Sequence, residues 1–165
     1  MTASPIYYDI IPSPIGPMML VADDDGLCEL RFELDYRPQT PLDSWVHAPD
    51  KLAQVRTQLE EYFAGERVEF ELKLNMQGTD FQKDVWQALM TIPYGVTTSY
   101  GEISQQINRP KASRAVGAAN GRNPVPVIVP CHRVIGSNGS LTGFGGGLAA
   151  KQWLLELESR RFSLR

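Results

Sequence analysis

The chain has 165 residues, of which 42% are hydrophobic and 21% charged, with a net charge of −3 at pH 7. This length can bury one hydrophobic core or two small ones. No apolar run approaches the roughly 18 residues of a membrane span, and the first residues lack the pattern of a secretory signal. The two cysteines, Cys28 and Cys131, have no paired or metal-ligand spacing, so we expect no disulfide framework and no zinc site. A cytoplasmic location is therefore predicted.

The first half of the chain has the patterns of short strands and one helix. Asp25-Gly26, between two apolar alternations, is typical of a tight hairpin turn. Gly65 follows a run with helical spacing and predicts its end. No catalytic pattern occurs here, so residues 1–76 are predicted to form a small α/β scaffold domain. Its expected elements are strands at 6–11, 18–22, 27–32 and 68–74, and a helix at 49–64.

The second half, residues 77–165, is predicted to be mostly helical. Thr79 and Gln82 have the spacing of a capping box, and so do Ser99 and Glu102. The helices that these boxes open extend to about residue 90 and to residue 107, and a third is predicted at 111–119. A short helix, a turn and a second short helix form a helix-turn-helix unit of winged-helix-like type, although the turn at 108–110 lacks the usual glycine.

The third predicted helix is unusually small on its surface. Arg114 is its one long side chain after Lys111, and alanine, serine and glycine surround it. Readers of the DNA major groove present several polar side chains, whereas a smooth helix suits a close approach to the minor groove. Small residues suit tight packing between helices equally well, so both interpretations stay open.

Charge is distributed unevenly along the chain. Residues 1–79 carry 6 Lys or Arg and 14 Asp or Glu, whereas residues 80–165 carry 10 and 5. No acidic residue occurs between Glu102 and Glu156, and an acid there would repel phosphate. This asymmetry favours a polyanionic partner for the second half. The basic residues in the interval are Arg109, Lys111, Arg114, Arg122, Arg133 and Lys151.

Cys131 follows the apolar run at 125–129 and Pro130, and it precedes His132 and a glycine-rich stretch. We predict that the run is extended and buried, and that it places the cysteine at the floor of a pocket. Glycines allow backbone to approach a ligand closely. A free cysteine is more often a small core residue, but the adjacent histidine makes a nucleophile an equal alternative.

Motifs in the second half resemble those of the O6-alkylguanine-DNA alkyltransferases, also called methylated-DNA–protein-cysteine methyltransferases. The first half agrees more loosely, through the segments at 13–16 and 26–27. The motifs that carry the resemblance are Ser99-Tyr100-Gly101, Ser113-Arg114-Ala115-Val116-Gly117, Asn123-Pro124-Val125-Pro126, Pro130-Cys131-His132-Arg133-Val134, Gly145-Gly146-Gly147-Leu148 and Glu158.

The resemblance implies direct reversal of DNA damage by a single-turnover S-methyltransferase without a cofactor. Cys131 would take an alkyl group from O6 of guanine, and O4 of thymine is a further candidate substrate. His132 would act as base through a bridging water, with Glu158 holding the imidazole. Tyr100 would donate a proton to the purine, and Asn123 would brace the turn before the active site.

The resemblance also implies a partner, double-stranded DNA containing O6-alkylguanine, bound by a monomer, with cooperative binding left open. Arg114 would replace the flipped nucleotide from the minor groove. The implied DNA contacts are Arg114, Ser113, Ala115, Arg109, Lys111 and Arg122, and the implied pocket residues are Val134, Phe144, Gly145, Gly146 and Lys151.

This chain departs from better-known relatives in its pocket wall. Phe144 stands where many have tyrosine, and Gly145 where some have serine, so a wider pocket is expected. Two other classes of protein stay open, a lesion-binding protein without activity and a cysteine hydrolase. Lesion-binding relatives without activity lack the cysteine and the first domain, and a cysteine hydrolase would need an intermediate that water can reach.

Overall fold

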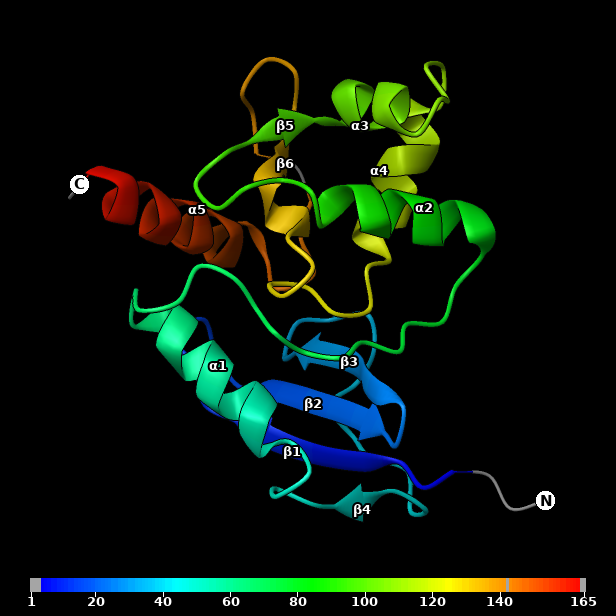
Figure 1. The fold of residues 1–165 in the computed structure, drawn as a ribbon, viewed down its shortest axis with the longest axis vertical. Helices are drawn as coiled ribbons and strands as arrows, with labels where there is room; N and C mark the ends of the chain where they lie inside the picture. Colours follow the sequence, from blue (N-terminus) through cyan, green and yellow to red (C-terminus); the bar gives the residue numbers. More distant parts are fainter. Residues whose placement is uncertain (1–3, 142, 164–165) are drawn as a thin grey trace. The chain divides into compact units, whose positions relative to one another are not determined.

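The structure is a computed structural model that describes residues 4–141 and 143–163. The chain forms two compact units, Met1–Gln77 and Gly78–Arg165, and each is considered by itself (Figure 1). The first is a mixed α/β unit and the second is mostly helical. Among the helices of the described residues, none has both the length and the apolar character needed to cross a membrane.

The first unit contains a four-stranded sheet with the strand order β3-β2-β1-β4. The first three strands are antiparallel, and the two-residue β4 pairs in parallel with β1. Helix α1 buries Val55, Leu59 and Tyr62 at helical spacing, so its apolar side forms part of the core. The elements are β1 Tyr7–Ile11, β2 Met18–Asp23, β3 Gly26–Phe32, β4 Val46–His47 and α1 Ala53–Phe63.

The predicted hairpin turn is confirmed. The Oδ1 atom of Asp23 accepts hydrogen bonds from the backbone N–H groups of Asp25 and Gly26, at 2.9 and 3.1 Å. Gly26 has φ +145°, and a Cβ at this position would lie 2.6 Å from the carbonyl oxygen of Lys73. Both the backbone conformation and the space therefore require glycine.

The strand predicted at 68–74 is wrong. Only Leu74 forms a bridge, to Leu27. At Glu71 the backbone N–H donates to the side chain of Gln58 at 2.9 Å, and the backbone oxygen accepts from the same amide at 3.2 Å. One buried glutamine from α1 thus satisfies the backbone groups of Glu71, while the Lys73 carbonyl and the Asn75 N–H bond to the backbone of Leu27.

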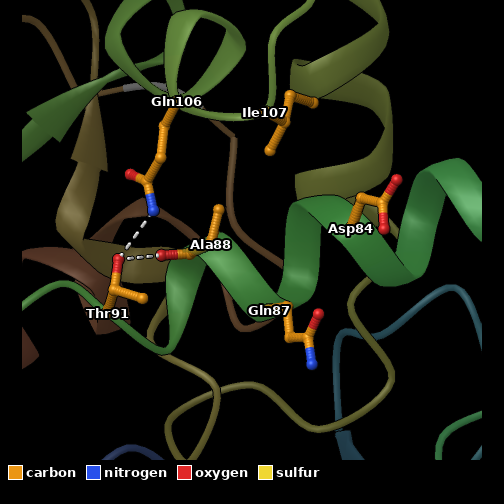
Figure 2. A pocket seen from close by; sticks show the side chains of 6 residues that line it. All are labelled: Asp84, Gln87, Ala88, Thr91, Gln106 and Ile107. Carbon is orange, nitrogen blue, oxygen red and sulfur yellow. Dashed lines mark hydrogen bonds between the residues drawn. The ribbon is translucent and has the colours of Figure 1, made fainter.

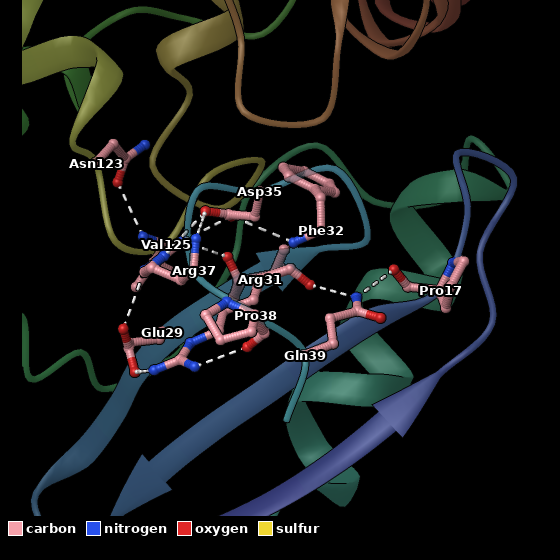
Figure 3. A network of polar contacts seen from close by, with 11 residues as sticks. Pro17, Glu29, Arg31, Phe32, Asp35, Arg37, Pro38, Gln39, Asn123 and Val125 are labelled. Carbon is pink, nitrogen blue, oxygen red and sulfur yellow. Dashed lines mark hydrogen bonds and ion pairs between the residues drawn. The ribbon is translucent and has the colours of Figure 1, made fainter. Parts of the chain in front are cut away.

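Polar contacts fix the segment after β3 in the first unit (Figure 3). The guanidinium of Arg37 lies 2.9 Å from Asp35 and 3.1 Å from Glu29, and it donates to the carbonyl of Leu30. Burial lowers the pKa of Arg37, but the hydrogen bond and charge of Asp35, together with Tyr36 and Glu29, outweigh it and raise the pKa. Gln39 donates to two further carbonyls, those of Pro17 and Arg31.

The second unit is built from helices α2 to α5 and a short parallel pair of strands, β5 with β6. Trp86 of α2 is almost fully buried and donates from its indole nitrogen to the carbonyl of Ala119 in α4, at 2.9 Å. This bond joins the first helix of the unit to the second helix of the helix-turn-helix. The elements are α2 Asp80–Leu89, β5 Thr98–Ser99, α3 Tyr100–Gln106, α4 Ser113–Gly121, the 3-10 helix η1 Cys131–Arg133, β6 Val134–Ile135 and α5 Leu148–Ser163.

The capping box at Thr79 and Gln82 is confirmed, since both of its hydrogen bonds are present. The second predicted box is only half formed. Ser99 accepts from the backbone of Glu102, but the Glu102 carboxylate accepts from the Thr98 hydroxyl instead of the Ser99 backbone. In the turn between α3 and α4, Asn108 has φ +61°, so asparagine adopts the left-handed conformation that the absent glycine would have taken.

The run at 125–129 is buried as expected, but the prediction that it is extended is wrong. The Val129 N–H donates to the Val125 carbonyl at 2.9 Å, and Val127 has φ +75°, so the run is a tight turn. Asn123 holds both sides of it, donating to the Val129 carbonyl at 2.8 Å and accepting from the Val125 N–H at 3.0 Å. A short apolar run does not distinguish a buried strand from a buried turn.

Candidate active site

Cys131 begins the 3-10 helix η1 directly after this turn, and its side chain is almost completely buried. Burial raises the pKa of the thiol from 9.0 to about 11, opposed by a hydrogen bond with Asn123 and by the positive charge of Lys151. A thiol with this pKa is protonated at neutral pH. It therefore needs a base if it is to react as a nucleophile.

His132 follows Cys131 and is fully buried. Its Nε2 lies 2.7 Å from Oε2 of Glu158, whereas its Nδ1 has no hydrogen-bond partner among the described residues. An ionised carboxylate can only accept, so Nε2 carries the proton and Nδ1 has a free lone pair. Burial, together with the positive charges of Arg133 and Lys151, lowers the pKa of His132 more than the hydrogen bond and charge of Glu158 raise it, so the ring is neutral near pH 7. The site thus holds an imidazole that can accept a proton.

Glu158 lies on α5 and is almost fully buried. Besides His132, it accepts from Nε and Nη2 of Arg133, at 2.8 and 3.0 Å, and from the backbone N–H of Gly95 at 3.2 Å. Burial raises the pKa of this carboxyl, but the bonds from His132 and Arg133 lower it further, to well below its usual range. Glu158 is therefore a carboxylate at any physiological pH.

Arg133 was predicted only as one of the basic residues that favour a polyanionic partner. This prediction is wrong for Arg133 and for Lys151, because both are buried. The Nη1 of Arg133 donates to the Ile92 carbonyl at 2.7 Å, and Lys151 donates to the Val134 carbonyl at 2.7 Å. The four other basic residues of that interval, Arg109, Lys111, Arg114 and Arg122, are exposed. Arg133 lies in a mostly apolar stretch of the sequence, and a cation in such a stretch is buried only if an anion pairs with it. That position was the signal for a buried partner such as Glu158.

The predicted pocket residues lie partly around this cluster. Phe144 meets the ring of His132 edge-on, with centroids 6.5 Å apart at 84°. Val134 is buried, Gly145 is exposed and Gly146 is half-buried. Asn120 of α4, which the sequence did not single out, directs its amide toward the Cys131 carbonyl at 3.5 Å. It connects the helix-turn-helix to the residue that carries the thiol.

The predicted DNA-contact residues gather at the helix-turn-helix. Ser113, Arg114 and Ala115 are exposed at the start of α4. On another side of α4, a Cβ at Gly117 would lie 3.8 Å from the ring of Tyr100, the first residue of α3. The small residues of α4 are therefore compatible with both interpretations. On one side they allow close packing against α3, and on another side they leave only short side chains around the exposed Arg114.

A hollow of about 490 Å³ lies between α2 and α3 (Figure 2). Within it, Gln106 donates to the Thr91 hydroxyl at 3.0 Å, and that hydroxyl donates to the Ala88 carbonyl. None of the predicted site residues lines it, and no cysteine or histidine does. We therefore do not place the chemistry there. Its lining is Asp84, Gln87, Ala88, Thr91, Gln106 and Ile107.

Two family models match the chain. One is described as 6-O-methylguanine DNA methyltransferase, ribonuclease-like domain, and matches residues 6–76. The other is described as 6-O-methylguanine DNA methyltransferase, DNA binding domain, and matches residues 80–160.

Individual relatives agree over nearly the full length. A methylated-DNA–protein-cysteine methyltransferase of Methanosarcina acetivorans is 53% identical over 153 residues, covering 93% of this chain and 98% of the relative. A crystal structure of Mycobacterium tuberculosis OGT in complex with DNA has a TM-score of 0.88 at 52% identity and covers 94% of both chains. A protein of Pyrococcus kodakaraensis, at 19% identity and a TM-score of 0.53, shares the fold.

Proposed function

The chain belongs to the 6-O-methylguanine DNA methyltransferase family, and from this membership we propose that it repairs DNA by moving an alkyl group from O6 of guanine to Cys131. One observation carries the proposal. The protonated Cys131 thiol adjoins a neutral histidine whose Nδ1 is unpartnered among the described residues, and a buried carboxylate holds that histidine. The arrangement follows the logic of a nucleophile, a base and a group that orients the base.

The reaction is a direct displacement at the alkyl carbon. The thiol gives its proton to Nδ1 of His132 through a bridging water, and the sulfur forms a bond to carbon while the carbon–O6 bond breaks. The electron pair goes to guanine, which takes a proton from Tyr100 and leaves as a neutral base. Solvent returns the proton from the imidazolium to Tyr100. The thioether has no hydrolytic route back to the thiol, so each molecule reacts once. O4 of alkylated thymine is a second candidate source of the alkyl group, with Cys131 again as the acceptor.

We assign the partner, double-stranded DNA, to the exposed face of the helix-turn-helix. Arg109, Lys111 and Arg122 are exposed cations that suit phosphates, and Arg114 stands among small residues. Arg114 would enter the base stack from the minor groove as the lesion is flipped toward Cys131. Residues 1–76 would act as the scaffold domain and residues 77–165 as the DNA-binding and acceptor domain.

The proposed state is a cytoplasmic monomer that needs no cofactor, with cooperative assembly on DNA left to experiment. The two cysteines, both free in the structure, support the location. A free thiol as the acceptor suits a reducing compartment.

The test is a mass measurement on the intact protein after mixing it with a duplex that contains O6-methylguanine. We expect one methyl group per protein, and peptide mapping should place it on Cys131. An undamaged duplex is the matched control. Sustained turnover beyond one equivalent would instead indicate a hydrolase-type enzyme, and lesion binding without transfer would indicate a damage-recognition protein.

A further inference from the structure

We propose that Arg133 is a positioning residue that shares the charge of Glu158 with His132, so that the imidazole stays neutral and keeps Nδ1 as the proton acceptor for Cys131. The inference rests on the proposed function, in which His132 is the base. It concerns a side chain whose polar contacts are with Glu158 and the Ile92 carbonyl.

The geometry of Arg133 is specific. Its guanidinium binds both oxygens of Glu158, at 2.8 and 3.0 Å, and its third donor binds the Ile92 carbonyl at 2.7 Å. The planar group lies 5.6 Å from the centroid of the Tyr94 ring. A bidentate pair fixes the orientation as well as the position of a carboxylate. Arg133 thereby directs Oε2 of Glu158 at His132, whose bond to that oxygen is 2.7 Å.

The electrostatic consequence follows from the burial of all three groups. A lone buried carboxylate beside a histidine favours the imidazolium, which has no lone pair at Nδ1. Arg133 places a compensating cation on the same carboxylate. Besides Glu158 and Arg133, the charged group that acts on His132 is Lys151 of α5, and the titratable Cys131 precedes His132 in the chain. Arg133 and Lys151 both act against a positive charge on the ring, and only Glu158 acts for it.

The test measures reactions of Cys131 that do not need DNA. Alkylation by iodoacetamide and transfer from free O6-benzylguanine are each followed from pH 5 to 9 in wild type, Arg133→Met and Arg133→Lys. For Arg133→Met we expect the acidic limb of both rate profiles to move to higher pH by about one unit, because the imidazolium is stabilised. Arg133→Lys keeps the cation but loses the bidentate bond, so its limb should move by less than half as much.

Arg67→Met provides the matched control. Arg67 lies in the first unit and likewise pairs with a carboxylate, Glu61 at 3.0 Å, and with a backbone carbonyl. Its loss should lower the melting temperature without moving either limb. An Arg133→Met protein that melts earlier but keeps the wild-type limb would overturn the proposal, since Arg133 would then be only structural. The iodoacetamide profile keeps its meaning even if no alkyl group is transferred from guanine.

A second measurement needs no variant that could fail to fold. The ring of His132 is titrated by NMR in the wild-type protein. We expect it to remain neutral, with the proton on Nε2, at pH values well below the ordinary titration of histidine near 6.5. An imidazolium at pH 7 would refute the proposal, whatever the behaviour of the variants.

Discussion

The two cysteines of this chain have the same acidity but different neighbours. Burial is the main cause in both cases, and it raises the pKa of Cys28 and of Cys131 to about 11. Around Cys28 the charges of Asp23 and Glu29 raise the pKa further, whereas Lys151 lowers that of Cys131. Cys28 donates to the carbonyl of Gly26 at 3.5 Å.

The comparison shows that acidity alone does not separate a structural cysteine from a nucleophile. The difference lies in a base that can remove the proton. Cys131 adjoins His132, whereas the first unit's histidine, His47, pairs with Asp9 at 3.1 Å. A protonated thiol can be held ready for reaction if its proton has an acceptor at the moment of attack.

The largest expected effect on alkyl transfer comes from replacing each cysteine in turn. Cys131→Ser should abolish alkyl transfer while lesion binding survives, because the acceptor atom is lost and the DNA face is untouched. Cys28→Ser should transfer one full equivalent. Single-turnover assays with methylated duplex and peptide mapping measure both. A methylated Cys28 would reverse the comparison.

Removal of the base should have the next largest effect. His132→Ala should slow transfer at pH 7 by about 100-fold, the lower end of general-base contributions. Only spontaneous ionisation would then supply thiolate, so the rate should rise about tenfold per pH unit toward the thiol pKa near 11. The pH profile with free O6-benzylguanine checks this. A variant as fast as wild type at pH 7 would show that another group activates Cys131.

The raised pKa of the buried Cys131 thiol should also make the stability of the protein depend on pH. A folded-state pKa raised from 9.0 to about 11 favours folding below pH 9, and this contribution is lost as the pH rises through 11. For Cys131, the free energy of unfolding should fall by about 2 kcal/mol between pH 8 and pH 11. Denaturant titrations should show a flatter alkaline slope for Cys131→Ser. Cys28 is more exposed, so Cys28→Ser should flatten the slope less.

The smallest effect concerns delivery of the lesion. Arg114→Ala and Arg114→Lys should react about tenfold more slowly with duplex lesions, because lysine lacks the planar guanidinium that would fill the base stack. Both should react normally with free O6-benzylguanine, which needs no flipping. Comparison of the two substrates in one assay is decisive. Equal slowing on both would place Arg114 in support of the pocket instead.

Local signals in the sequence were sufficient for much of the fold. The hairpin at Asp25-Gly26 and the cap at Thr79 depend on residues a few positions apart, and both are confirmed. The segment at 68–74 could not be predicted in the same way. In its middle, the backbone of Glu71 bonds to the side chain of Gln58, which lies on another element. The alternation of polar and apolar residues at 68–74 does not indicate that a distant side chain will bond to this backbone.

In the candidate active site, too, the residues that are adjacent in the sequence were predicted, whereas the long-range pairing of Arg133 with Glu158 was not. Cys131 and His132 are adjacent in the sequence, and their motif carried the resemblance to the family. Arg133 was misassigned because sequence charge counts cannot tell an exposed cation from one that is paired inside the unit. Its partner Glu158 lies 25 residues further along the chain. Only the fold brings the two together.

Because several hydrogen bonds converge on Glu158, the site cannot form until the part of the chain that contains Glu158 has been synthesised. Gly95, His132 and Arg133 all donate to a carboxylate on the final helix, α5. During synthesis the ribosome therefore releases the thiol before the group that orients its base. A nascent chain or a C-terminally truncated fragment contains Cys131 but not the arrangement that activates it. The reactive arrangement is available only to a molecule in which α5 has been made and Glu158 has met His132 and Arg133.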